Sequence, residues 1–488
     1  MFGVVPNPLR GSALLRFLRA PGGPLRKNST LSARSRLSFR LMGLGVLFRS
    51  AYWVPMLIGC GAVRGQEVVP VPYIYTEAPR YDSAATLKGG ERFPAGAALQ
   101  LVAGGRQRAL AAGFAASADA TVSFDGQRVL FSGKQKAGDA WQIWEMPVSG
   151  GAARRIVPIQ AGDKAGDKAG VREDAIAPFY LPGDRMVYSR RTPAGFQLVS
   201  VALDGGAPLE LTYGPGNRVA SDVLRDGRVL FEAGRELYTV YSDGSGVESY
   251  RCDHGPERGG ARELASGDIL FASGGKLARF TSARAVQLPV ALPKGDYAGP
   301  VAELPSGAWL VSYRPAATAP YGLYRWRLGE ALPEKLLTPA GQAVQPVLVQ
   351  PRPVPKRHPS ALGDRQGANL LCLNVYTSKL RIAGGSVAKV RVWAQSDGGS
   401  AVMMGEAPVE KDGSFFVNPP SETAIRFELL DRSGKIVAAE KGWFWARRGE
   451  QRVCVGCHAG PERAPENAVP QVLLRSTEPV RLSVPGVK

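Results

Sequence analysis

Short apolar runs of β-branched and aromatic residues recur through the middle of the chain, and each strong run follows a turn that contains glycine. In the first, Asp125-Gly126 precedes Val129-Leu130-Phe131, and the same pattern returns four times. Short apolar runs bounded by turns predict β-strands, and a second apolar run within most copies predicts β-hairpins. The five turn glycines are Gly126, Gly183, Gly227, Gly267 and Gly307.

The spacing of these glycines predicts a repeated structural unit. Successive glycines are 57, 44, 40 and 40 residues apart, and the longest interval contains a polar segment, 161–164, that is duplicated in 165–168. A period of about 42 residues with four short strands is typical of a β-propeller blade. We therefore expect residues 61–349 to form a propeller of six or seven blades that resembles the TolB-type family. A β-sandwich is the alternative, although sandwiches do not usually show such a repeat.

A proline-rich segment separates this repeat from a second region of alternating residues. Four prolines lie within 350–359, so residues 350–369 are expected to form a stiff linker. Beyond it, runs such as Ile425–Leu430 alternate again. We expect residues 370–488 to form a small antiparallel β-sandwich with Cys372 in its core, so that the whole fold is all-β.

The positive charge of the chain is concentrated at its start. The formal net charge is +19 over 488 residues, and residues 1–60 hold nine basic residues and no acid. An apolar stretch within 41–59 is interrupted by Arg49 and Pro55, which makes it too broken for a membrane-spanning helix. Residues 1–60 therefore predict an export signal. The remaining basic residues are scattered without a nucleic-acid motif, so we expect no nucleic-acid partner.

The end of the signal segment favours a lipid anchor. Leu57-Ile58-Gly59-Cys60 resembles a bacterial lipobox, in which Cys60 would be lipidated and would hold the protein at a membrane outside the cytoplasm. The expected localisation is thus periplasmic or extracytoplasmic, as a membrane-anchored lipoprotein of a bacterium. An ordinary signal peptide with a chance cysteine is the alternative.

The clearest chemistry in the sequence is a C-x-x-C-H motif at residues 454–458. Two thiols at this spacing can add to the two vinyl groups of one haem, and the histidine that follows them can bind the iron as an axial ligand. We expect one covalent haem c per chain. A zinc site completed by Cys252 or His254, and a thioredoxin-like thiol pair, are the alternatives. The predicted haem-binding residues are Cys454, Cys457 and His458.

Residues around the motif are typical of a haem pocket, yet each has a structural alternative. Trp443-Phe444-Trp445 can cover a porphyrin or pack in a protein core. Arg447, Arg448 and Arg452 can pair with haem propionates or remain solvated. The sixth iron ligand is left open by the sequence, because no methionine follows the motif. Its candidates are His254, His358, Met403, Met404 or an open coordination position.

Several motifs in the second region resemble the middle domain of the hydrazine synthase alpha subunit family. They are Glu410-Lys411-Asp412-Gly413-Ser414-Phe415, Pro419-Pro420, Phe427-Glu428-Leu429-Leu430-Asp431, Trp443-Phe444-Trp445, Gly449-Glu450 and the C-x-x-C-H motif. The resemblance implies a propeller followed by a haem-bearing β-domain, in which Cys454 and Cys457 form thioethers. It does not establish hydrazine synthesis, since the alpha subunit of that family carries a second c-type haem and works with partner subunits.

Three functions fit these features. The main prediction is an exported monohaem c-type cytochrome-like protein that transfers electrons to a redox partner protein or subunit, with the propeller as a docking scaffold. The second is a haem-dependent oxidoreductase that acts on a small nitrogen or oxygen species at an open iron position. The third is a propeller binding module whose haem is structural or sensory. Carbon monoxide binding to the reduced iron separates the second from the first.

Overall fold

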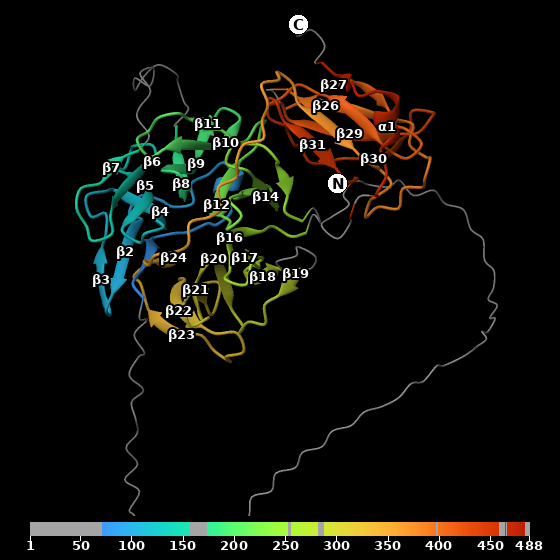
Figure 1. Cartoon of the computed structure of the whole chain (residues 1–488). Helices are drawn as coiled ribbons and strands as arrows, with labels where there is room; N and C mark the ends of the chain where they lie inside the picture. Colours follow the sequence, from blue (N-terminus) through green and yellow to red (C-terminus); the bar gives the residue numbers. More distant parts are fainter. Residues whose placement is uncertain are drawn as a thin grey trace, which may run out of the picture. The chain divides into compact units, whose positions relative to one another are not determined.

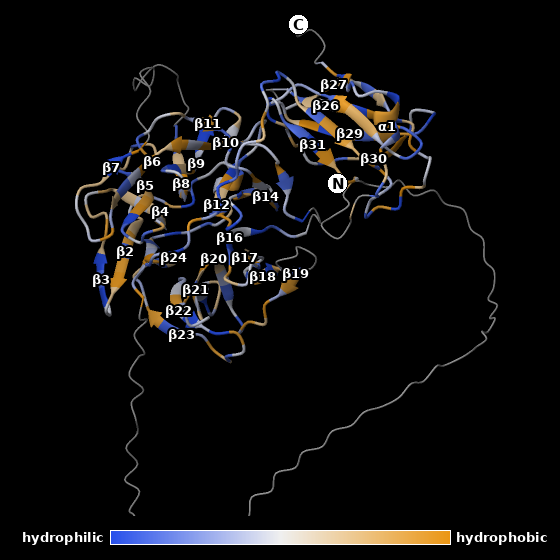
Figure 2. Cartoon of the chain, viewed as in Figure 1, coloured by the Kyte–Doolittle hydropathy of each residue, from blue (hydrophilic) through white to orange (hydrophobic). Residues whose placement is uncertain are grey.

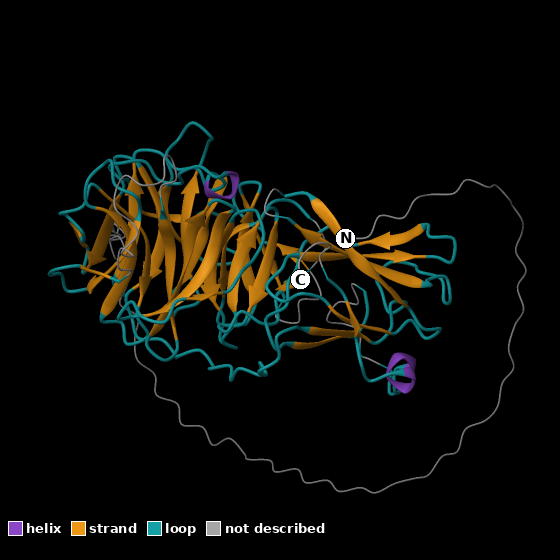
Figure 3. Ribbon diagram, turned by 90° about the horizontal axis from the view of Figure 1, so that it is seen from above, coloured by secondary structure: helices purple, strands orange, loops and turns teal. Residues whose placement is uncertain are grey.

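The computed structural model describes residues 71–156, 173–251, 255–281, 287–396, 399–457, 464 and 466–483. These residues belong to one compact unit and form eight four-stranded β-sheets (Figure 1; Figure 3). Helical structure in them is confined to η1 (Thr86–Lys88) and α1 (Gln471–Arg475). No helix in this part of the chain is long and apolar enough to cross a membrane. The prediction of an all-β fold is therefore confirmed.

Six of the described sheets are the blades of a β-propeller, which agrees with the predicted six or seven. The first blade combines β24 (Gln342–Leu348) with β1 (Tyr73–Ala78), β2 (Ala98–Ala103) and β3 (Arg106–Ala109). Each of the other blades uses four consecutive strands, which are β4 (Ala116–Val122), β5 (Arg128–Lys134), β6 (Gln142–Pro147), β7 (Arg154–Arg155), β8 (Ala175–Leu181), β9 (Arg185–Thr192), β10 (Gly195–Ala202), β11 (Leu209–Glu210), β12 (Arg218–Val223), β13 (Val229–Ala233), β14 (Glu236–Val240), β15 (Glu248–Ser249), β16 (Gly259–Glu263), β17 (Ile269–Ser273), β18 (Lys276–Phe280), β19 (Gln287–Pro289), β20 (Asp296–Glu303), β21 (Trp309–Arg314), β22 (Gly322–Trp326) and β23 (Glu334–Leu337). The first blade closes the ring, because β1 from the start of the repeat pairs antiparallel with β24 from its end.

The repeated turn glycines adopt a backbone conformation that other residues rarely take. Each joins the first two consecutive strands of one of the last five blades, and their φ angles lie between 77° and 91°. Glycine reaches this region without a steric penalty because it has no Cβ. The sequence repeat therefore reflects a backbone requirement that recurs from blade to blade.

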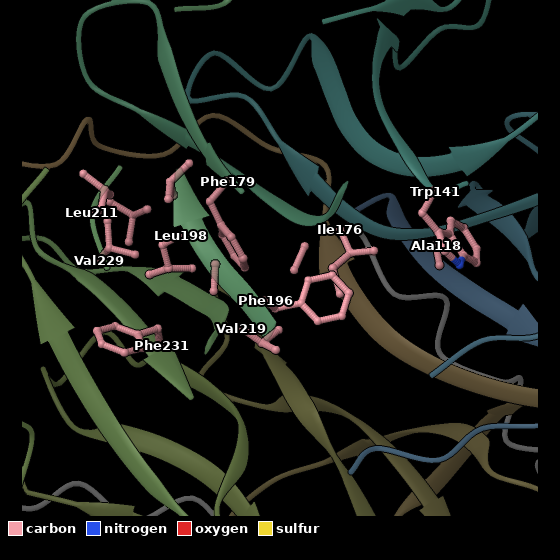
Figure 4. Close-up of a cluster of buried hydrophobic side chains, with 14 of the residues drawn as sticks. Ala118, Trp141, Ile176, Phe179, Phe196, Leu198, Leu211, Val219, Val229 and Phe231 are labelled. Carbon is pink, nitrogen blue, oxygen red and sulfur yellow. The ribbon is translucent and has the colours of Figure 1, made fainter. Parts of the chain in front are cut away.

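Apolar side chains fill the spaces between neighbouring blades. Figure 2 shows apolar residues distributed along the strands, and Figure 4 shows a cluster that includes Phe179 of β8, Phe196 and Leu198 of β10, and Phe231 of β13. These four side chains are buried. Burial of each is worth about 1.5–3 kcal/mol, so contacts of this kind are the main stabilising force of the propeller.

The proline-rich segment lies against the propeller turns. The backbone N–H groups of Arg352 and Lys356 donate to the carbonyl oxygens of Phe124 and Arg225, each over 2.9 Å. The Arg352 guanidinium also lies 4.4 Å from the centroid of the Phe124 ring. A Cβ on the turn glycine Gly227 would overlap the Lys356 carbonyl oxygen. Glycine is thus required at this turn for the close approach of the segment as well as for its φ angle.

The last two sheets form a β-sandwich. One has the strand order β31-β25-β28-β32 and the other β27-β26-β29-β30. Buried side chains from both sheets, among them Cys372, Val392 and Phe415, share one core. The strands are β25 (Asn369–Cys372), β26 (Lys389–Gln395), β27 (Ala401–Pro408), β28 (Phe415–Asn418), β29 (Ile425–Leu430), β30 (Ile436–Ala439), β31 (Gln451–Cys454) and β32 (Val480–Arg481).

The expected antiparallel pairing is wrong for the first of these sheets. β25 runs parallel to β31, and β28 runs parallel to β32. Alternation of apolar residues shows which face of a strand is buried, but it is the same for either strand direction. The sheet is therefore mixed, and its parallel pair places Cys372 opposite Cys454.

Candidate functional site

The first cysteine of the C-x-x-C-H motif is the last paired residue of an edge strand. Cys454 ends β31, which is bonded only to β25 within its sheet. The Leu373 N–H donates to the Cys454 carbonyl oxygen over 2.9 Å and holds the strand end in register. The motif then leaves the sheet as a loop from Val455 to Cys457. This arrangement fixes one thiol by strand pairing and carries the other on a turn.

A buried carboxylate anchors the segment that enters β31. Glu450 accepts hydrogen bonds from the Arg447 N–H over 2.7 Å and from the Gly246 N–H over 3.1 Å. Its Oε1 also accepts from the Arg452 guanidinium over 2.7 Å. Glu450 is buried, and its negative charge is neutralised by the positive charge of Arg452. The entry to the motif is therefore held by backbone donors and an ion pair at once.

The glycine inside the motif touches a neighbouring turn. A Cβ on Gly456 would lie 2.6 Å from the Asn374 carbonyl oxygen and would overlap that of Thr377. The turn is itself fixed, because the Thr377 N–H donates to the Asn374 carbonyl oxygen over 3.1 Å and the Tyr376 N–H donates to the Asn374 side chain over 2.8 Å. The second thiol is thus held in place by backbone packing at Gly456.

Replacing Gly456 by alanine is expected to destabilise the β-domain by about 1–3 kcal/mol, since overpacking displaces either the loop or the turn. Urea unfolding followed by tryptophan fluorescence measures the loss. Gly384→Ala is the matched control, because no atom lies within 4 Å of its Cβ position, and it should stay within about 0.5 kcal/mol of the parent. An equal loss in both variants would contradict close packing of the motif loop.

A third thiol lies beside the motif. Cys372 is buried in the β-domain core, as the sequence predicted. The neighbouring Cys457 thiol raises the pKa of Cys372 well above its ordinary value, and burial adds to this shift. Burial also raises the pKa of Cys454, although the nearby Arg452 charge acts in the opposite direction. All three cysteines are free thiols.

The aromatic segment before the motif packs in protein cores. Trp445 is 2% exposed and belongs to the same buried cluster as Val219 of the propeller. Its ring lies 6.2 Å from that of Tyr213, edge to face, and 5.3 Å from the Arg218 guanidinium. Phe444 meets the Phe427 ring at 5.1 Å and 81°. Of the two readings of this segment, core packing is the one that these contacts favour.

Of the arginines expected near haem propionates, Arg448 is exposed, whereas Arg447 and Arg452 already have protein partners. Arg447 pairs with Glu422 over 2.9 Å and also donates to the Tyr213 hydroxyl. Arg452 pairs with Glu450. Their charges therefore fix the backbone around the motif. The sequence did not reveal these two ion pairs, because the fold decides which carboxylate each arginine meets.

The remaining predicted site residues are only partly described. His458, His254, Cys252 and Cys60 lie outside the described residues. The His358 ring stacks on Tyr241 with centroids 3.7 Å apart and an interplanar angle of 16°. Met404 is buried in the β-domain core, whereas Met403 is 45% exposed. Within the described ranges, no group of three or more histidine, cysteine, aspartate or glutamate residues is arranged to hold a metal ion.

Charged side chains inside the propeller have ion-pair or hydrogen-bond partners in the protein. Asp119 pairs with Arg92 over 3.2 Å and accepts from the Gln345 amide over 2.8 Å. Burial raises the pKa of Glu232, whose carboxylate accepts from the Gly260 N–H over 2.6 Å. The cavity between these groups measures about 30 Å³, which is room for one or two water molecules. This network is suited to holding the blades together.

The two motif cysteines fit the attachment of a porphyrin by thioethers. Both thiols are free and partly exposed, and both are carried by one short edge segment. The neighbouring Val453 is 59% exposed, so an apolar side chain already faces outward beside them. Thioether formation needs two accessible thiols at the C-x-x-C spacing, and these residues meet that requirement.

Comparisons with known proteins bear on the same segment. Residues 382–459 match the family model of the hydrazine synthase alpha subunit middle domain. Over a larger part of the chain, the structure of Kuenenia stuttgartiensis hydrazine synthase is similar with a TM-score of 0.69 and 16% identity, covering 83% of this chain and 71% of that one. The predicted resemblance to the hydrazine synthase alpha subunit family is therefore confirmed, and the likeness to the solved hydrazine synthase shows a shared fold.

Two further comparisons concern a TolB structure and the curated protein sequences. TolB from Acinetobacter baumannii is similar with a TM-score of 0.42 and 13% identity, covering 60% of this chain and 68% of that one. No curated protein sequence matches the chain.

Proposed function

We propose that this chain is a haem c oxidoreductase of the hydrazine synthase alpha type, acting on a small nitrogen or oxygen species. The observation that carries the proposal is the pair of free, partly exposed thiols, Cys454 and Cys457, in a segment that matches the hydrazine synthase alpha middle domain. A C-x-x-C-H motif attaches one haem through its two cysteines. The sequence contains this motif once, so the proposal includes one covalent haem c per chain.

A bound haem would supply an iron that exchanges electrons with a small ligand. The residues of the chain hold its two attachment points. Strand pairing between β25 and β31 fixes Cys454, and the contact of Gly456 with the Asn374–Thr377 turn fixes Cys457. Glu450 and Arg452 neutralise each other beside the motif.

The cellular setting belongs to the same proposal. In bacteria, haem is attached to C-x-x-C-H motifs outside the cytoplasm, which agrees with an export signal in residues 1–60 and with lipidation of Cys60. A redox partner protein or subunit would exchange electrons with the haem. His458 would bind the haem iron, and whether the iron also accepts a small ligand would decide between an oxidoreductase and electron transfer alone.

The proposed function predicts that the haem iron binds small ligands. We expect full-length protein matured by a periplasmic haem-attachment system to give a c-type pyridine haemochrome that resists acid-acetone extraction. After reduction with dithionite, addition of carbon monoxide should shift the absorption spectrum, because an open iron position accepts the ligand. An unchanged spectrum would contradict oxidoreductase activity at the iron and favour electron transfer. Absence of haem would contradict both.

A further inference from the structure

Three thiols gather at one edge of the β-sandwich, and they are not equivalent. The Cys457 thiol is the largest influence that raises the pKa of Cys372, whereas Cys454 occupies the strand position opposite Cys372. Cys457 packs against the same buried cluster that contains Cys372. The thiol of the second motif cysteine is therefore directed toward the β-domain core, where a partner sulfur already lies.

The backbone keeps this pair together. Gly456, next to Cys457, has no room for a Cβ because it lies against the carbonyl oxygens of Asn374 and Thr377. This turn begins two residues after Cys372, and the Leu373 N–H bonds to the Cys454 carbonyl oxygen over 2.9 Å. The segments that carry Cys372 and Cys457 are thus pinned to each other on both sides of the thiol contact.

We propose that, in the chain without haem, Cys372 and Cys457 form a disulfide that withholds Cys457 from thioether formation. The proposed disulfide rests on the packing that brings the segments of Cys372 and Cys457 together. Its consequence for haem attachment rests on the proposed function. Cys372 would then determine when the motif can react, since a sulfur already in a disulfide cannot add to a vinyl group.

The chemistry requires a disulfide oxidant, such as oxidised glutathione. The partly exposed Cys457 attacks one sulfur of the oxidant as a thiolate, which forms a mixed disulfide and releases one glutathione thiol. The buried Cys372 then attacks the Cys457 sulfur, so that the protein disulfide forms and the second glutathione thiol leaves. The two protein thiols lose two electrons and two protons in total, and one glutathione disulfide becomes two thiols.

Peptide mapping of the full chain tests this pairing. The protein is produced without haem attachment, treated with oxidised glutathione, alkylated with iodoacetamide and digested with trypsin. Cleavage at lysine and arginine releases Cys372 in residues 366–379 and both motif cysteines in residues 453–463. We expect these two peptides to be joined, with Cys454 alkylated. A disulfide within 453–463, a Cys372–Cys454 link or the absence of a disulfide would each overturn the proposal.

Two variants sharpen the result. In Cys454→Ser, the link between the two peptides should persist, because neither paired thiol is changed. In Cys372→Ala, that link should be lost, and its thermal unfolding midpoint shows whether the variant still folds. If Cys372→Ala does not fold, Cys454→Ser still decides the pairing, since 366–379 and 453–463 then hold one cysteine each.

Haem attachment gives a separate readout. Incubation of the oxidised protein with haem and its attachment system should yield haem c only after a thiol reductant is added. Cys454→Ser is not used in this experiment, because it lacks one of the two attachment cysteines. A disulfide mapped to Cys372 and Cys457 in a chain that never accepts haem would refute the proposed function and leave the disulfide standing. Equal attachment to oxidised and reduced protein would overturn the control of attachment by Cys372.

Discussion

Simultaneous replacement of Cys454 and Cys457 by serine is expected to abolish covalent haem. Serine has nearly the same size as cysteine, but its hydroxyl does not replace the thiolate, which is the nucleophilic form of cysteine. The fold should tolerate the change, because both positions are only partly buried. Haem staining after denaturing electrophoresis measures covalent attachment, and the mass of the intact protein confirms it.

The matched control for this experiment is Cys372→Ala, which removes the third sulfur of the same cluster and keeps the motif. It should retain haem staining under reducing conditions, because Cys372 takes no part in the thioethers. Staining that survives in the double serine variant would contradict attachment through the motif. Loss of staining in Cys372→Ala as well as in the double variant would place Cys372 among the residues that maturation requires.

The propeller was predictable because its turns repeat. A glycine with positive φ recurs at the same place in five blades, and its spacing is visible in the sequence. The number of blades was not fixed, because the first blade joins β1 and β24, which are separated by nearly the whole repeat region. Pairing over such a distance leaves no local pattern, and the same period is compatible with six or seven blades.

The candidate site was predictable only where its chemistry is local. Cys454 and Cys457 are recognised by spacing, whereas the position of Cys372 beside them depends on a parallel pairing between β25 and β31. Strand alternation carries no information about that pairing. For the same reason, the partners of Arg447 could not be inferred, since Glu422 and Tyr213 are brought to it by the fold.

Trp445→Ala is expected to destabilise the protein by about 3–5 kcal/mol, the usual cost of removing a buried large aromatic side chain. Trp445 is 2% exposed, and its ring contacts Tyr213 and the Arg218 guanidinium. Burial lowers the pKa of Arg218 to about 10, so this cation is already poorly solvated and the ring provides one of its favourable contacts. Thermal or urea unfolding of the haem-free chain measures the effect.

Trp445→Phe is the informative control, because the Trp445 Nε1 has no hydrogen-bond partner among the described residues. Phenylalanine therefore keeps an aromatic face for Arg218 without sacrificing a hydrogen bond, and its loss of stability should be clearly smaller than that of alanine. A porphyrin-covering role makes the opposite prediction. If Trp445→Ala left the unfolding of haem-free protein unchanged but shifted the absorption spectrum of the haem-bearing form, Trp445 would belong to the haem pocket and its core contacts would be of minor energetic weight.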